Sequence, residues 1–121
     1  MNIEATRTYY ENMLLTDLCD CNYCQNYIKE IKKTYPLVAN YLEGIGVNIE
    51  KPFETMPLEP DNNKIEYIAA QYVVFGDFKK FKETIISNVS IQIAKSHPCI
   101  DINEKHFVIE ISPIILNWVY N

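Results

Sequence analysis

The spacing of apolar residues changes once along this chain, near residue 47, from a helical period to an alternating one. Before that point apolar residues recur three and four positions apart, which is typical of amphipathic helices that cover a core. After about residue 65 apolar and polar residues alternate, which is typical of strands with one buried face. Helices followed by a run of strands indicate an α+β fold.

Three helices are predicted in the first part of the chain, over residues 6–15, 22–34 and 37–43. The second has the clearest apolar stripe, and it must end at Tyr35-Pro36 because the residue before a proline avoids the α region. Pro36 is then a favourable first residue for the third helix. Gly44 is a favourable residue to end it.

Residues 48–64 are predicted to form an extended loop, because they contain three of the 6 prolines and end in the turn-forming run Asp61-Asn62-Asn63. Three strands are predicted after the loop, over residues 65–75, 84–94 and 106–119. Pro113 is expected to force a bulge, an edge position or a break in the last strand. Regular alternation places Tyr67 and Tyr72 on opposite faces of the first strand, and we expect most of the tyrosines to lie at the rim of a small core.

We therefore predict a single α+β domain over residues 1–121. Its N-terminal helices, within about residues 5–45, pack on a C-terminal antiparallel β-meander, within about residues 65–119. The connections between the strands are too short, or lack the helical pattern, to contain crossover helices. A chain of 121 residues is long enough to bury a core without obligatory crosslinks.

The composition excludes several classes of protein. Hydrophobic residues make up 48% of the chain and only 3 residues are glycine, which excludes a disordered or collagen-like protein. The formal net charge of −5 argues against a nucleic-acid partner. No apolar run approaches the roughly 20 residues of a membrane span, and Glu4, Glu11 and Asp17 interrupt the region where a signal peptide would be apolar. We expect a soluble cytoplasmic protein with no membrane association.

The cysteines give the strongest indication of function. Three of the 4 lie within six residues, at Cys19, Cys21 and Cys24. In a chain without a secretory signal, such a cluster favours metal binding or thiol chemistry over structural disulfides. A structural zinc ion needs four ligands. The fourth is expected from Cys99 or His97, which flank Pro98, or from His106.

Two other interpretations of the cluster stay open. The three thiols could simply be reduced, because cysteine packs well as a small apolar residue. Alternatively, Cys21 or Cys24 could be a reactive thiolate at the start of the second helix, where unpaired backbone N–H groups lower the pKa of a thiol. Asp17 and Asp20 oppose thiolate formation nearby.

No set of catalytic residues is predicted. Ser96-His97 and Asp101 supply the residue types of a catalytic triad, but neighbours in sequence rarely take its geometry. No Gly-x-Ser-x-Gly motif and no Gly-rich phosphate loop is present. We therefore predict a binding protein rather than an enzyme.

The cluster also takes part in a resemblance that spans nearly the whole chain. The segments that carry it are Cys19-Asp20-Cys21-Asn22-Tyr23-Cys24, Tyr35-Pro36, residues 42–47, Lys51-Pro52-Phe53-Glu54, residues 57–60, residues 72–76 and His106-Phe107-Val108. Together they resemble a group of small bacterial proteins from Gram-positive anaerobes. The resemblance implies a stand-alone domain with Cys-Asp-Cys-x-x-Cys as part of its motif; it implies no activity and does not include Cys99.

These observations lead to one principal hypothesis and one alternative. The principal hypothesis is a small cytoplasmic binding or interaction protein whose cysteine cluster holds a structural zinc ion. Its partner would be another protein or a second copy of the chain, because an open antiparallel sheet has edges that a homodimer can cover. The alternative is a thiol-dependent redox protein or enzyme that uses Cys21 or Cys24.

Overall fold

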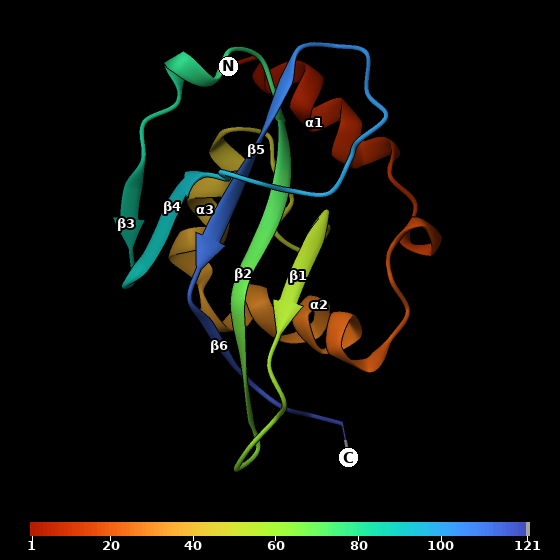
Figure 1. Cartoon of the computed structure of the whole chain (residues 1–121), viewed down its shortest axis with the longest axis vertical. Helices are drawn as coiled ribbons and strands as arrows, with labels where there is room; N and C mark the ends of the chain where they lie inside the picture. Colours follow the sequence, from red (N-terminus) through yellow and green to blue (C-terminus); the bar gives the residue numbers. More distant parts are fainter. Residues whose placement is uncertain (121) are drawn as a thin grey trace.

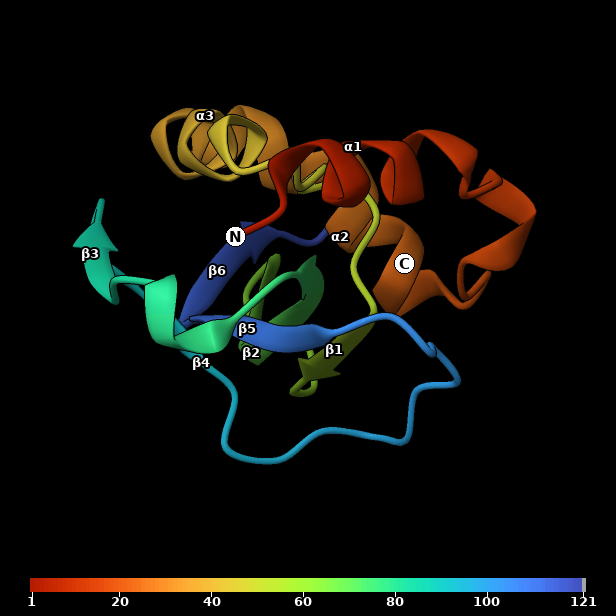
Figure 2. The same ribbon diagram turned by 90° about the horizontal axis from the view of Figure 1, so that it is seen from above.

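The computed structural model describes residues 1–120 and places the helices on one face of an antiparallel sheet (Figures 1 and 2). The α-helices of this part of the chain are α1 (Ile3–Asn12), α2 (Asn22–Thr34) and α3 (Pro36–Gly44). The strands are β1 (Glu54–Pro57), β2 (Lys64–Phe75), β3 (Thr84–Ile86), β4 (Val89–Ile93), β5 (His106–Ser112) and β6 (Ile114–Asn117). The predicted α+β fold, with N-terminal helices and a C-terminal antiparallel sheet, is confirmed.

The helices follow the sequence closely, with one shift. Helix α2 has the predicted bounds, and α3 begins at Pro36 as expected. Helix α1 begins three residues earlier than the predicted helix, 6–15, and also ends three residues earlier. It begins early because Asn2 caps it by accepting a hydrogen bond from the backbone N–H of Ala5. None of the helices in residues 1–120 combines the length and the apolar composition needed to cross a membrane.

The strand order, which the sequence left open, is β1-β2-β5-β4-β3, with β6 also paired to β2. Strands β5 and β6 follow one another along the same edge of β2: β5 pairs with Ala70–Phe75, and β6 pairs with Lys64–Tyr67. Pro113 separates the two, so the predicted break at this residue is confirmed. On the other edge, β1 pairs with β2.

Two strand predictions need correction. Residues 84–94 form a hairpin instead of one strand, because Ser87 and Asn88 take positive φ angles of 54° and 64° and turn the chain between β3 and β4. Both strands of such a hairpin keep the alternating pattern, so periodicity alone does not show the turn. Residues 48–64 contain the short strand β1 within the predicted loop. The predicted turn at its end is present, with positive φ at Asn62 and Asn63.

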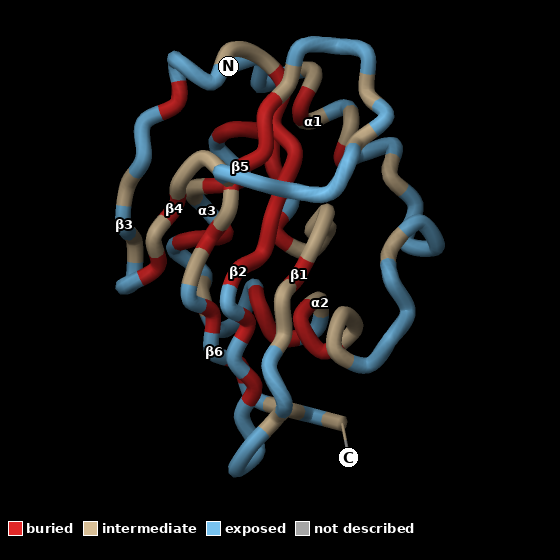
Figure 3. Tube along the Cα trace, viewed as in Figure 1, coloured by how far each residue is buried: buried red, intermediate tan, exposed pale blue. Residues whose placement is uncertain are grey.

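The core lies between the helices and the sheet, and its buried residues are concentrated along β2 and β5 (Figure 3). Several of the core residues are tyrosines. Tyr27, Tyr67 and Tyr72 are all fully buried, so the expectation that tyrosines lie mainly at the rim is wrong for these three. Tyr67 and Tyr72 both contact α2, although regular alternation predicts opposite faces. The reason is an irregularity in the pairing with β1, where Thr55 opposes Ala70 but Pro57 opposes Tyr67, which adds one residue to β2.

A chain of hydrogen bonds crosses this core. The Tyr72 hydroxyl donates to the carbonyl oxygen of Ile49 at 2.6 Å, so the Tyr27 hydroxyl, also 2.6 Å away, must be the donor to Tyr72. Burial raises the pKa of both tyrosines well above the ordinary value for a phenol, which keeps them neutral hydrogen-bond donors. Helix α2, strand β2 and the segment after α3 are therefore joined through polar atoms that water does not reach.

We expect Tyr72→Phe to lower the free energy of unfolding by about 2–4 kcal/mol, because it leaves two buried polar groups without partners. The matched variant Tyr27→Phe removes only a donor, keeps the bond to Ile49, and should cost about 1 kcal/mol. Urea unfolding of both variants measures the difference. Equal losses would contradict the proposed direction of the hydrogen bonds.

Candidate metal centre

The structure brings the thiols of Cys19, Cys21 and Cys24 together on the segment that leads into α2. The three sulfur atoms all lie within 4.8 Å of one another, and the Sγ atoms of Cys19 and Cys21 are 3.3 Å apart. Cys19 and Cys21 are exposed, whereas Cys24 is half-buried. The predicted cysteine cluster is therefore present in a geometry that could hold a metal ion.

The first turn of α2 fixes the middle thiol of the cluster. Cys21 is the N-cap residue of this 13-residue helix, and its Sγ accepts a hydrogen bond from the backbone N–H of Cys24 at 3.5 Å. Helix N-termini carry unpaired N–H groups and partial positive charge. A thiolate, or a metal ion bound by several thiolates with net negative charge, is favoured at this position.

Two side chains that the sequence did not single out hold the other two cysteines. Gln25 donates through Nε2 to the carbonyl oxygen of Cys19 at 2.9 Å, which closes the turn before the helix. Thr55 of β1 lies with its Oγ1 3.6 Å from the Sγ of Cys24. Thr55 gave no signal because the prolines around it predict a loop, and Gln25 gave none because its role depends on the turn itself.

Hydrogen bonds other than the Thr55 contact also connect the start of α2 to the sheet. The Tyr67 hydroxyl of β2 donates to the carbonyl oxygen of Tyr23 at 2.5 Å, and the Tyr23 hydroxyl donates to Glu59 at 3.0 Å. Both contacts fall in the first turn of α2 and reach the strand and the loop below it. The helix end that carries Cys21 and Cys24 is thus held in place by groups from two other segments of the chain.

The pKa values of Cys21 and Cys24 are shifted in opposite directions. Partial burial raises the pKa of Cys21, but hydrogen bonds from the Cys24 backbone and the Cys19 thiol outweigh that effect and leave its pKa below the ordinary value. Burial raises the pKa of Cys24 to about 12. Cys21 therefore supplies thiolate more readily than Cys24, which needs a positive charge, such as a metal ion, to lose its proton at neutral pH.

A small cavity of about 80 Å³ adjoins the cluster. Cys19 and Cys24 line it together with residues of β1 and of the preceding loop: Pro52, Phe53, Glu54 and Thr55. Its volume exceeds the roughly 30 Å³ that a water molecule occupies in the liquid. A metal ion held by the three thiols would have room on this side for a water ligand.

The other residues considered as ligands lie elsewhere. Within residues 1–120 the group of close ligand atoms contains only the three cysteines, without His97, Cys99 or His106. His97 and Cys99 lie on the exposed segment between β4 and β5, which Figure 2 shows running along the face of the sheet opposite the helices. The centroid of the His97 ring lies 6.3 Å from the centroid of the Phe53 ring. The Nδ1 of His106 lies 2.8 Å from the carbonyl oxygen of Glu104.

The sulfur positions suit a tetrahedral metal ion. A zinc–sulfur bond of about 2.3 Å in tetrahedral geometry places sulfurs about 3.8 Å apart. The Cys19–Cys21 spacing is 3.3 Å, and no spacing among the three exceeds 4.8 Å. Small side-chain rotations would bring all three to one ion. Such an ion would bridge residues of a single short segment, so it would stiffen the turn before α2 without crosslinking the helices to the sheet.

In reduced, metal-free protein we expect an alkylating reagent to modify Cys21 at least about ten times faster than Cys24 at neutral pH, because a lowered pKa gives the larger thiolate fraction. Raising the pH should bring Cys24 into reaction only in strongly alkaline solution. Peptide mass mapping of timed samples measures both rates, with the exposed Cys99 as an internal reference. Faster modification of Cys24 than of Cys21 would contradict this description of the cluster.

Comparisons with models of protein families, with curated proteins and with solved structures found no match.

Proposed function

We propose that this chain is a small binding protein that holds a thiophilic metal ion, zinc in the first instance, through Cys19, Cys21 and Cys24. The observation that carries the proposal is the convergence of three sulfur atoms within 4.8 Å at the N-terminus of α2. Thiolates bind zinc and other soft metals in preference to magnesium or calcium. The fourth position would be taken by water in the adjoining cavity, which keeps the centre open on one side.

The bound ion would act on the chain around it. The segment between α1 and α2 carries two exposed leucines, Leu14 and Leu15, with 63% and 72% of their surface accessible. Binding of three neighbouring thiols to one ion removes conformational freedom from this segment. We propose that the metal-stiffened turn presents these leucines to a protein partner, which is the interaction role expected from the sequence.

Cobalt titration of reduced protein tests the metal proposal. We expect one Co²⁺ per chain, with the visible bands of tetrahedral cobalt and a near-ultraviolet thiolate charge-transfer band, and displacement by one Zn²⁺. Serine variants of Cys19, Cys21 and Cys24 should each weaken zinc binding by at least about 100-fold, because each removes a direct ligand.

Cys99→Ser is the matched control, because this cysteine is exposed and lies outside the cluster. It should bind zinc as tightly as the wild-type protein, and so should His97→Ala. Loss of tight binding in either control would contradict a three-thiol centre and would identify a fourth protein ligand. No stoichiometric metal in the wild-type protein would overturn the proposal.

One observation favours a second function for the same residues. Cys19 and Cys21 are 3.3 Å apart between sulfurs, and Cys19 donates its S–H to Cys21, so one thiol stands next to a favoured thiolate. A thiol-dependent redox role would use this pair. It predicts no stoichiometric metal and a disulfide between Cys19 and Cys21 after mild oxidation, so the cobalt titration separates the two functions.

A further inference from the structure

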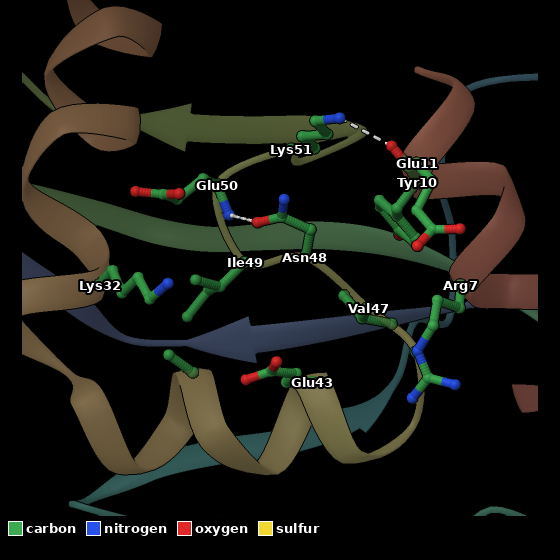
Figure 4. A pocket seen from close by; sticks show the side chains of 12 residues that line it. Arg7, Tyr10, Glu11, Lys32, Glu43, Val47, Asn48, Ile49, Glu50 and Lys51 are labelled. Carbon is green, nitrogen blue, oxygen red and sulfur yellow. Dashed lines mark hydrogen bonds between the residues drawn. The ribbon is translucent and has the colours of Figure 1, made fainter. Parts of the chain in front are cut away.

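A second candidate site lies on the helical side of the molecule and shares no lining residue with the thiol cluster. It is a pocket of about 340 Å³ between the three helices and the segment that follows α3 (Figure 4). Its walls come from α1 (Arg7, Tyr10, Glu11), α2 (Lys32), α3 (Ala39, Glu43) and residues 46–51. The volume falls at the lower end of the range for small-molecule sites.

The wall formed by residues 46–51 is fixed in position. Lys51 donates through Nζ to the carbonyl oxygens of Tyr10 and Met13, at 2.7 and 2.8 Å, and so binds the C-terminus of α1. Gly46 has a φ angle of +90°, and a Cβ there would lie 2.7 Å from the carbonyl oxygen of Ile3. Helix α1 and this segment therefore approach as closely as their backbones allow, and the pocket is formed before any ligand binds.

The floor of the pocket is apolar and the rim is charged. Tyr10, Ala39, Val47 and Ile49 are buried and form the floor.

Two polar side chains of the pocket wall are already engaged in hydrogen bonds within the protein. Lys51 uses two of the three donors of its ammonium group on α1. The Asn48 side chain accepts a hydrogen bond from the backbone N–H of Glu50 at 2.9 Å, so its oxygen is engaged by its own loop.

Charges of both signs surround this floor without neutralising each other. Figure 4 shows Lys32 and Glu43 extending over the floor from two different helices, and Arg7 and Glu11 at the α1 side. Among residues 1–120, Lys32, Glu11 and Glu43 take part in no ion pair, and Arg7 pairs only with Glu4 outside the pocket. A ligand can therefore meet both cations and carboxylates that are not already paired.

We infer that this pocket binds a small zwitterion, namely a free α-amino acid with an aliphatic side chain. A ligand with one charge would face a like charge on the rim, whereas a zwitterion can direct its carboxylate to Lys32 and its ammonium group to Glu43. The aliphatic side chain would then cover the apolar floor. Polyanionic ligands such as nucleotides are disfavoured, because the cations that line the pocket are matched by an equal number of carboxylates: Arg7, Lys32 and Lys51 against Glu11, Glu43 and Glu50.

The test uses two-dimensional amide NMR spectra of the ¹⁵N-labelled full chain, titrated with L-leucine, L-valine and L-methionine in the presence of a metal chelator. We expect saturable shifts of the amides of residues 46–51, Arg7 and Lys32. Isoamylamine and 4-methylpentanoate have the carbon skeleton of leucine without its carboxylate or its amine, and each should bind at least about ten times more weakly.

Charge-neutral variants locate the interaction. Lys32→Gln and Glu43→Gln should each weaken amino-acid binding by at least about tenfold, whereas Lys82→Gln and Glu66→Gln, at exposed positions outside the pocket, should leave it unchanged. The proposal is overturned if none of the three amino acids gives saturable shifts at the pocket. It is also overturned if the single-charge analogues bind as tightly, or if the control variants lose as much affinity as the pocket variants. Because the chelator removes metal, these outcomes are independent of the thiol centre.

Discussion

Strand β2 is the element on which both candidate sites depend. It pairs with β1 on one edge and with β5 and β6 on the other, and its second half is buried on both faces. Its tyrosines position the surrounding segments: Tyr67 holds the first turn of α2, where the thiols lie, and Tyr72 holds Ile49 in the floor of the pocket. A buried hydrogen-bond network whose partners are all satisfied makes the structure around it rigid. The helices and the segment after α3 therefore have little freedom to shift relative to the sheet.

The two sites are built in different ways. The thiol cluster is local: its three sulfurs come from six consecutive residues, and the capped turn before α2 is sufficient to bring them together. The pocket is non-local, since α1, α2, α3 and residues 46–51 each supply part of its wall. A metal ion would therefore act mainly on the exposed segment before α2. A ligand in the pocket would instead stabilise the packing of all three helices, because it would bind only where they are correctly assembled.

This difference explains what the sequence predicts and what it does not. Helix α2 is predicted to the residue, because its apolar stripe and Pro36 agree, and the cysteine cluster is found because spacing along the chain decides it. The prediction that Tyr67 and Tyr72 lie on opposite faces of the strand is wrong because β2 has one extra residue where it pairs with β1. The sequence does not show this irregularity, because the prolines around β1 predict a loop there. The pocket has no signature at all: Lys32 and Glu43 are ordinary surface charges until the helices bring them over a shared apolar floor.

Zinc X-ray absorption spectroscopy of the zinc-loaded protein would show whether the cysteine cluster forms a three-thiolate centre that is open on one side. We expect three sulfur scatterers at about 2.3 Å and one light scatterer from water at the shorter distance typical of oxygen. The Cys99→Ser variant should give the same spectrum. Two or fewer sulfurs per zinc, or four sulfurs, would contradict an ion held by Cys19, Cys21 and Cys24 alone.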